Sequence, residues 1–457
     1  MIVEPKFSVS KVIDFCCITL IVLIFISKLS FKWMQIVPYS IPPIIFQYGL
    51  HPFINFGLQF AIALILIFYW LKHRPIYPLS KIYKAFIYSL IAVLSIQTFF
   101  QITLVNVTQS VIVQLGGLGM AVMLILVYGI IVPSVFPLKR LIFWINRTST
   151  LLVITSVLFL PVLWPHMFRG GRFVGFFKHI PHMVTASTAS FIFFFPKMFQ
   201  DKPWTLKNNT LLKILGVFII TIAVMLTATK AAFGTILITG FVGILIYGSK
   251  KRSTRLFKFT FLGCFLISAL LVGAPTSKFM YEVTTGKTGF GLRPAQDGVS
   301  SRMDEVFRGW SMFEQSPWFG NGLLYKFFSG SKEGIDVEGY NSFKDPHNMF
   351  VSSGVIGGYP LMIMSIVGYL LMMVAVLKGL KENDPDRQTM ALFLLAHLPV
   401  FVIYHASFSL GGMGDRIYWL VFGYLGQEWN SINKNFGKIT QPIGKSQQKI
   451  YQDPSNF

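Results

Sequence analysis

The tetrapeptide Asp345-Pro346-His347-Asn348 places a histidine where a long polar segment meets an apolar one. Asp is a favoured N-cap residue and Pro a favoured first helical residue, so the spacing predicts a helix with His347 in its first turn. The positive end of the helix dipole lowers the pKa of an imidazole in that position and keeps the ring neutral, as a general base requires. The alternative is a histidine that only helps to cap a transmembrane helix.

Two arginines have the chemistry to bind an anionic group. Arg172 lies in a Gly-Gly-Arg-Phe-Val-Gly stretch, where glycines let the backbone approach a ligand closely. Arg302 follows Ser301, a plausible N-cap with Asp304 three residues later, so Arg302 is expected in the first turn of a helix. A guanidinium beside unpaired helix amides suits a phosphate.

Lys230 and Arg416 lie at the ends of two further apolar segments. Cations at such positions are either members of an anion site or residues whose side chains reach out to the membrane surface. Because several cations are expected on one face, the sequence favours an anionic ligand there.

The sequence predicts no metal site and no cofactor. Histidines flank the Arg172 segment without a carboxylate or cysteine at ligand spacing: His166, His179 and His182. His397 and His405 share an apolar segment and are expected to face the inside of a helix bundle. The three cysteines also lie in apolar segments, and no Walker loop, Gly-x-Ser-x-Gly or dinucleotide fingerprint occurs.

The composition predicts the elements that must position these residues. Of 457 residues, 53% are hydrophobic and only 13% are charged, with a mean hydropathy of +0.61, which is typical of a polytopic membrane protein. Twelve apolar segments are long enough to cross a bilayer, or nearly so: 12–28, 54–71, 85–105, 111–132, 148–164, 183–199, 210–229, 231–248, 256–274, 347–377, 389–406 and 415–427. The predicted fold is therefore all-α, with nine spans in 1–274 and three in 347–429.

The net charge of +22 follows this predicted topology. If the N-terminus is cytoplasmic, the inner connections and both termini hold 25 of the 40 basic residues, in accordance with the positive-inside rule. The excess therefore indicates contact with anionic lipid head groups and excludes nucleic acid as the expected partner. Residues 430–457 are then a polar cytoplasmic tail, and the single long connection, 275–346, lies outside the cytoplasm.

The long connection holds half of the 18 acidic residues and predicts one amphipathic helix. Its apolar positions recur at helical spacing and are Met303, Val306, Phe307, Trp310 and Phe313. Such a helix lies on the bilayer surface or against the bundle, and Pro317, Gly320 and Gly322 are expected to end it. After the loop, Gly354 and Gly358 form a small-residue face that suits close helix packing.

These motifs together resemble the O-antigen ligase and polymerase family of bacterial inner-membrane glycosyltransferases. Their order and predicted topology match that family over residues 160–360. The matching stretches are Arg172-Phe173-Val174-Gly175, Ser301-Arg302 followed by Trp310, Pro317-Trp318-Phe319-Gly320-Asn321-Gly322, and His347-Asn348.

The resemblance implies a GT-C-like membrane enzyme of the bacterial inner membrane with its active site facing the periplasm. The implied donor is an undecaprenyl-diphosphate-linked glycan, and the acceptor is a second glycan or lipid A-core. His347 would be the base with Asp345 as the reserve candidate, and Arg172, Arg302, Lys230 and Arg416 would contact the diphosphate.

Several functions remain open on the sequence. An O-antigen polymerase and an O-antigen ligase share donor and mechanism, and polymerase is slightly favoured because nothing marks a lipid A-core site. A protein O-oligosaccharyltransferase is a variant of the same chemistry. A polysaccharide flippase or transporter is the alternative from another class, but it would be expected to show repeated halves and midplane charges.

Overall fold

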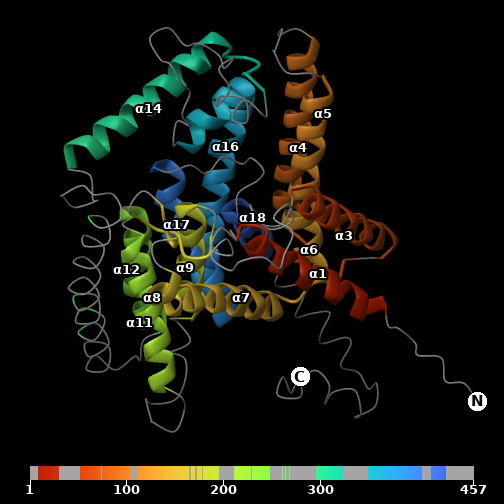
Figure 1. Cartoon of the computed structure of the whole chain (residues 1–457). Helices are drawn as coiled ribbons and strands as arrows, with labels where there is room; N and C mark the ends of the chain where they lie inside the picture. The colour runs from red at the N-terminus through yellow and green to blue at the C-terminus, as the bar shows by residue number, and fades with distance from the viewer. Residues whose placement is uncertain are drawn as a thin grey trace, which may run out of the picture.

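The computed structural model describes residues 9–29, 52–73, 75–103, 111–163, 166–169, 172–177, 179–194, 210–227, 229–247, 295–322, 348–403 and 413–428, with the isolated positions 260, 263, 267 and 282. These residues are almost all helical (Figure 1). The predicted helical architecture is confirmed, with one addition that the sequence did not indicate. That addition is a two-stranded hairpin in which β1 (Phe168–Arg169) pairs antiparallel with β2 (Arg172–Phe173).

Most helices overlap the predicted apolar segments, but α7 begins at Leu138, ten residues before the predicted segment 148–164. In chain order they are α1 (Val9–Ile26), α3 (Pro52–Lys72), α4 (Lys81–Thr103), α5 (Val111–Leu124), the π-helix η2 (Ile125–Ile131), α6 (Val132–Val135), α7 (Leu138–Leu158), α8 (Leu160–Leu163), α9 (Ile180–Phe194), α11 (Thr210–Leu226), α12 (Lys230–Tyr247), α14 (Ala295–Gln315), α16 (Met349–Lys381), α17 (Pro385–Ile403) and α18 (Met413–Leu425). The ninth predicted segment, 256–274, lies almost entirely outside the described ranges, as does the tail. The count of twelve spans therefore stays a prediction.

The described helices indicate a membrane protein. Four of them are long and apolar enough to cross a bilayer, namely Lys81–Thr103, Gln114–Val135, Leu138–Leu158 and Met349–Lys381. Large apolar side chains such as Phe68, Phe99 and Val374 stay exposed on their outer faces. An exposed apolar surface of this extent is what lipid covers.

The core lies where α9, α16, α17 and α18 meet, since these helices contact one another in several pairs. Figure 1 shows α4 and α5 side by side, as their residue contacts confirm, whereas α7 crosses the bundle at a steep angle and contacts α1, α9 and α11. α14 lies along one end of the bundle in Figure 1 and packs on α16.

The predicted span 111–132 is interrupted by η2. A π-helix shifts the backbone hydrogen bonds by one residue, and here the Tyr83 hydroxyl donates to the Gly129 carbonyl at 2.9 Å. A Cβ placed on Gly423 of α18 would lie 2.5 Å from the same carbonyl oxygen. Because glycine has no Cβ, α18 can pack directly on the backbone of η2.

α16 is not the single straight span that was predicted for 347–377. The helix breaks at Gly357 and Gly358, where Gly358 has a φ of 68°, and the ring centroids of Phe350 and Tyr369 are only 5.6 Å apart. In a straight α-helix those two residues would be about 28 Å apart. A first arm, 349–356, therefore folds back along a second arm, 359–381.

Pro360 explains where the break falls. It has no N–H to donate to the carbonyl of Ile356 four residues earlier, so the helical ladder stops at that point. The second arm carries an exposed apolar stripe at helical spacing, which ends at Lys378 and Lys381: Ile363, Ile366, Val367, Leu370, Met373, Val374 and Leu377. That arm is the part of α16 that a bilayer would surround.

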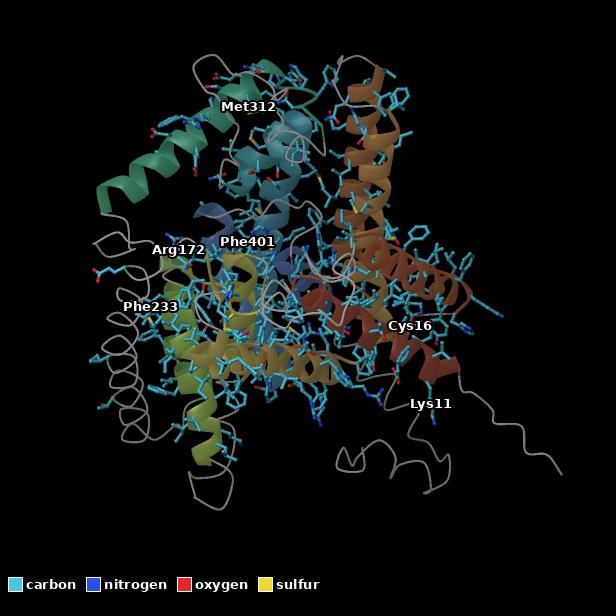
Figure 2. All side chains as sticks on the ribbon, in the orientation of Figure 1. Lys11, Cys16, Arg172, Phe233, Met312 and Phe401 are labelled. Carbon is cyan, nitrogen blue, oxygen red and sulfur yellow. The ribbon has the colours of Figure 1, made fainter. Side chains whose placement is uncertain are left out.

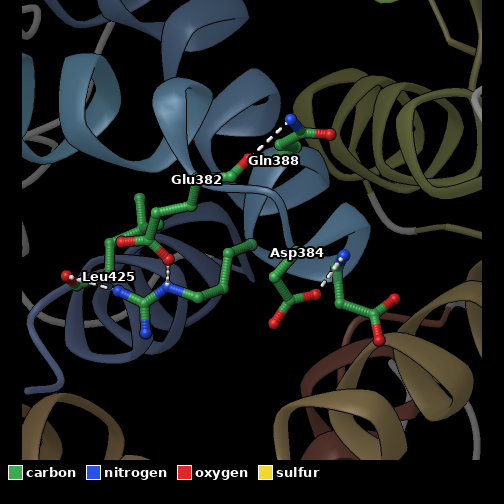
Figure 3. A network of polar contacts seen from close by, with 6 residues as sticks. Glu382, Asp384, Gln388 and Leu425 are labelled. Carbon is green, nitrogen blue, oxygen red and sulfur yellow. Dashed lines mark hydrogen bonds and ion pairs between the residues drawn. The ribbon is translucent and has the colours of Figure 1, made fainter. Parts of the chain in front are cut away.

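A buried ion pair closes the end of the bundle where α16 turns into α17 (Figure 3). Arg387 lies between the predicted spans 347–377 and 389–406, but its side chain is only 1% exposed and pairs with Glu382. It also donates to the carbonyl of Leu425 on α18 at 3.3 Å. Burial raises the pKa of the Glu382 carboxyl, and the positive charge of Arg387 opposes that change. Three helices are thereby joined at one buried charge pair.

Candidate functional site

The first arm of α16 begins at Met349, and Asn348 is its N-cap. The Asn348 side-chain oxygen accepts hydrogen bonds from the amides of Phe350 and Val351 at 3.0 and 3.1 Å. The prediction of Asp345 as the N-cap and His347 in the first helical turn is therefore wrong. Asn caps a helix as well as Asp does, and it stands closer to the apolar run.

Asp345 and His347 themselves lie outside the described residues, and the chain places His347 directly before the cap. Since Asn348 satisfies the helix amides, a capping role for His347 is not needed to explain the start of α16. The Asn348 side chain also donates to the carbonyl of Val402 on α17 at 3.0 Å. This bond ties the start of the first arm to a neighbouring helix.

The start of the first arm is sunk into the bundle. Tyr369, which lies about 15 Å along the second arm from Tyr359, donates to the carbonyl of Leu398 at 3.4 Å. Asn348 reaches Val402, one turn further along the same helix. The position directly after His347 therefore lies at the depth of Tyr369 and not at the Tyr359 end of α16.

The segment 317–322 holds the fold-back in place. The amides of Asn321 and Gly322 donate to the carbonyls of Val355 and Ile356 at 2.7 and 3.1 Å, and the Tyr359 amide donates to the carbonyl of Pro317 at 2.7 Å. These bonds satisfy the groups that the break in α16 leaves without helical partners. The Pro-x-x-Gly-x-Gly stretch is thus a structural clasp on the break, and it ends α14 as predicted.

Glycine is required on both sides of this clasp. Gly320 and Gly358 both have a positive φ, 69° and 68°. A Cβ on Gly358 would lie 2.5 Å from the carbonyl carbon and oxygen of Trp318, and a Cβ on Gly320 would overlap the Ile356 carbonyl. A Cβ on Gly354 would lie 3.0 Å from the Cδ2 atom of Phe313 in α14. The predicted small-residue face therefore packs on α14, through Gly354, and on the clasp, through Gly358.

Gln101 joins a third element to the clasp. Its side-chain amide, on α4, donates to the carbonyl of Phe319 at 2.5 Å and to that of Ile356 at 2.7 Å. Gln101 is almost fully buried, so both bonds form in the low-dielectric interior. Sequence reasoning missed this residue, because a lone Gln near the end of an apolar helix carries no local signal.

α14 differs from the predicted amphipathic helix at its start. It begins at Ala295, so Ser301 is not an N-cap and Arg302 lies in the second turn, away from the helix amides. Pro294 and Asp297 provide an earlier start signal in the sequence. The structure describes the backbone of Arg302 and not its side chain, so its part in an anion site stays a prediction.

The predicted apolar face of α14 is divided between two surroundings. Phe313 is buried, with its ring 4.8 Å from that of Tyr359 on α16. Met303, Phe307 and Trp310 stay exposed, with Phe307 at 60%. The end of α14 nearest the clasp therefore packs on the bundle, Val306 is partly buried against the core, and the other three apolar side chains stay exposed.

Arg172 lies on β2 of the small hairpin, and its side chain is half-buried. The turn after the hairpin has Gly175 at a φ of 55°, and a Cβ there would be 2.6 Å from the Ser156 hydroxyl of α7. The same hydroxyl accepts from the Phe176 amide at 3.2 Å. The glycine of the Arg-x-x-Gly motif therefore seats the hairpin on α7. In Figure 2, Arg172 lies at about the height of Phe401 and below Met312.

The two remaining predicted cations stand in different surroundings. Lys230 is the first residue of α12, rather than the last of the preceding helix, and only its backbone is described. Arg416 of α18 is 2% exposed, so it does not reach out to a membrane surface. The structure thus overturns the surface alternative for Arg416 and places it beside Tyr128 of η2, which sequence reasoning had not singled out.

The structure describes one of the two histidines that were expected to face the inside of the bundle. His397 is buried, with Nδ1 2.8 Å from the Phe393 carbonyl and Nε2 3.4 Å from the Thr188 hydroxyl, as expected for a bundle-facing residue. His405 lies outside the described residues. No group of three potential metal ligands occurs within the described residues, and the absence of a metal site stays a prediction.

Comparison with known families supports the resemblance seen in the sequence. Residues 215–366, about a third of the chain, match the family described as O-Antigen ligase. That range contains α11 from its sixth residue, α12, α14, the clasp and the first arm of α16, together with Lys230, Arg302, Asp345 and His347. Arg172 and Arg416 lie outside it. Comparison with curated proteins gives no match.

Proposed function

Because the chain carries a domain of the O-antigen ligase family, we propose that it transfers a glycan from a polyprenyl-diphosphate-linked oligosaccharide. The proposed site faces the periplasm from the bacterial inner membrane, and the proposed product is a longer surface polysaccharide. This assignment makes the protein an O-antigen polymerase. Transfer to lipid A-core or to a protein hydroxyl is the same chemistry with another acceptor.

In the proposed reaction, an acceptor hydroxyl attacks the anomeric carbon of the donor sugar. The bond from that carbon to the phosphate oxygen breaks, and polyprenyl diphosphate leaves with the bonding electron pair. His347 accepts the proton of the attacking hydroxyl, with Asp345 in reserve. Arg172 and Arg302, with Lys230 and Arg416, stabilise the charge that develops on the leaving diphosphate.

One observation supports this proposal most directly: the residues that match the family include the segment in which α16 folds back. The first arm lies within the matched range and begins at Asn348, directly after His347. Its start lies at the depth of Tyr369, within the part of the bundle that lipid surrounds. A group held there reacts away from bulk water, which strengthens its interactions with a charged leaving group.

Reconstitution tests the proposal. The purified protein in liposomes is given a polyprenyl-diphosphate oligosaccharide, and glycan length and released polyprenyl diphosphate are measured. We expect longer glycans and equimolar release from the wild type. With His347→Ala, we expect turnover per folded molecule to fall by about 10²–10⁴-fold, because a positioned base contributes that much.

Asn348→Ala is the matched control for the capping alternative. Loss of a cap lowers the free energy of unfolding by about 1 kcal/mol, so this variant should be less stable. If His347 is only a cap, His347→Ala should behave in the same way, with activity falling only in proportion to folded protein. Glycan that moves across the membrane without being extended would favour the flippase alternative.

A further inference from the structure

A cavity of about 430 Å³ lies between α3, α4 and α5, away from the clasp (Figure 1). Its walls include Phe60 and Leu64 of α3, Ile91 and Ser95 of α4, and Leu118 and Gly119 of α5. Phe60 is 53% exposed and Leu64 is 37% exposed, so the cavity opens to the surroundings of the protein and is not enclosed in the bundle. Its volume is that of a small-ligand site.

The walls of this cavity offer no free group to a polar ligand. Apart from Ser95, the lining residues are glycine, aliphatic residues, phenylalanine and methionine. The Ser95 hydroxyl donates to the Ile91 carbonyl of its own helix at 2.9 Å. Water would find no hydrogen-bond partners there, and an unfilled space would lose dispersion contacts. The occupant that suits these walls is therefore a hydrocarbon chain.

The cavity opens at the depth of the hydrocarbon core of a bilayer. Two of its three walls belong to helices long and apolar enough to cross a membrane, namely α4 and the segment Gln114–Val135. Ile91 and Ser95 lie in the middle of α4. The chains of membrane lipids therefore surround the mouth of the cavity.

A cation stands on the same face of α4 as the cavity wall. Lys84 precedes Ile91 by seven residues, which is two helical turns or about 10 Å along the axis. Lys81 stands three residues earlier, and neither lysine has a carboxylate partner among the described residues. A lipid whose chain fills the cavity would bring its head group to these lysines, because half a hydrocarbon core is about 15 Å thick.

The distribution of charge decides which kind of lipid fits. The sequence has no charged residue between Lys84 and Lys139, so the other ends of α4 and α5 provide no cation for a head group. α4 begins at the end of the molecule where Leu79 pairs with Gln427, which is the end predicted to be cytoplasmic. Anionic phospholipids give the cytoplasmic leaflet its negative surface. The diphosphate of the proposed donor belongs to the opposite face.

We infer that this cavity binds one acyl chain of an anionic phospholipid from the cytoplasmic leaflet, with the lipid phosphate at Lys84 and Lys81. The site is separate from the residues assigned to glycan transfer and does not depend on that reaction. It is a specific lipid site on the surface formed by α3, α4 and α5.

Native mass spectrometry of the full chain, released from detergent micelles, tests the head-group contact. Dioleoyl phosphatidylglycerol and dioleoyl phosphatidylcholine are the two probes, since they have the same chains and differ in net charge. Wild type should retain one phosphatidylglycerol more tightly than phosphatidylcholine. Lys84→Gln should weaken phosphatidylglycerol binding about 5-fold, because a lysine near an anionic lipid surface contributes about that much. Lys381→Gln, an exposed lysine at the same end of the molecule on α16, should bind as wild type does.

Filling the cavity tests the chain contact. A Cβ on Gly119 would meet nothing within 4 Å, so Gly119→Leu places a side chain in the open cavity. We expect it to weaken phosphatidylglycerol binding about 10-fold or more, as for an extra side chain inserted into a packed site. Gly116→Leu is the matched control, because Gly116 lies one turn earlier on α5, also has open space at its Cβ and does not line the cavity. Phosphatidylglycerol should raise the unfolding temperature of Gly116→Leu and not that of Gly119→Leu.

Three results would overturn the inference. One is equal binding of the two phospholipids by wild type, and another is unchanged phosphatidylglycerol binding in both Lys84→Gln and Gly119→Leu. The third is displacement of phosphatidylglycerol by undecaprenyl phosphate whose own binding is lost in Gly119→Leu and kept in Lys84→Gln. That result would assign the cavity to the donor chain and leave the proposed function standing. If Gly119→Leu gives less folded protein than Gly116→Leu, the comparison of Lys84→Gln with Lys381→Gln decides alone.

Discussion

At the scale of single residues, the structure shows which residues hold the backbone around the predicted site and how far its arginines are buried. Asn348 has the capping role that had been assigned to Asp345, so the start of α16 needs no cap from His347. Arg416 is enclosed, whereas Arg172 lies half-buried on a hairpin that Gly175 seats on α7. Asn348 and Gly175 therefore position the backbone, whereas Arg172 and Arg416 are residues that were predicted to bind a ligand.

The two loop arginines give a prediction at this scale. Arg172→Lys and Arg302→Lys keep the charge but lose the planar fork that binds a phosphate through two parallel hydrogen bonds. We expect each variant to insert and fold normally and to lose about 10-fold or more in turnover, measured with the reconstituted protein. Lys213→Arg on α11 is a control for a cation not assigned to the site. Full turnover in both Arg302→Lys and Arg302→Ala would remove Arg302 from it.

At the scale of elements, the break in α16 and the clasp at 317–322 depend on one another. Pro360 has no N–H to donate to the Ile356 carbonyl. That carbonyl instead accepts hydrogen bonds from the Gly322 amide and from the Gln101 side chain. Three elements, α4, the clasp and α16, therefore meet at one carbonyl. The first arm keeps its fold-back only while this junction is intact.

Gly358→Ala tests this junction. The substitution puts a Cβ against the Trp318 backbone at a positive φ, and backbone strain of this kind amounts to about 1–3 kcal/mol. We expect lower thermal stability in detergent and a loss of transfer activity larger than the loss of folded protein. Gly57→Ala on α3 is the matched control, since its Cβ would meet nothing within 4 Å. Equal behaviour of the two variants would show that the clasp does not constrain the arm.

Glu382→Gln tests the junction of α16, α17 and α18. Removing one member of a buried ion pair leaves the other charge uncompensated, a loss of about 3–5 kcal/mol in the free energy of unfolding for a fully buried pair. Because Glu382 is 14% exposed, we expect the lower end of that range in thermal or denaturant unfolding. The exposed pair of Arg140 and Asp14, 2.5 Å apart, is the control, and Asp14→Asn should change stability by about 1 kcal/mol or less.

At the scale of the whole molecule, the distribution of basic residues and the exposed apolar side chains predict how the protein is oriented in a membrane. The Lys378 end of α16 and the clasp end are separated by the whole second arm, about 33 Å of helix. That length matches the hydrocarbon core of a bilayer. The predicted cytoplasmic side corresponds to the Lys378 end, and the loop with α14 then lies on the other side.

Labelling with a membrane-impermeant thiol reagent tests this orientation. A cysteine in place of Lys332 should react in intact cells, and one in place of Lys445 in the tail should react only after the membrane is opened. The native Cys16 and Cys17 are buried and should not react, which the parent protein checks. Labelling of the tail from outside would reverse the topology and contradict every site assignment.

The sequence alone determined the class of the molecule and most of its helical segments. Apolar runs, alternating basic connections and a few spaced motifs follow from local composition, and the helices they predicted are present wherever the structure describes them. The O-antigen ligase resemblance also came from short motifs in order, and the match over 215–366 confirms it.

Only the tertiary structure decided how those segments meet. The fold-back of α16 and the clasp on its break join residues from different segments, and the bond from Gln101 to Ile356 joins residues 255 positions apart, so no local pattern specifies such pairings. The two buried arginines show the same limit. Whether a guanidinium in an apolar helix has a carboxylate, as Arg387 has, or lies beside a tyrosine hydroxyl, as Arg416 does, depends on which helix packs beside it.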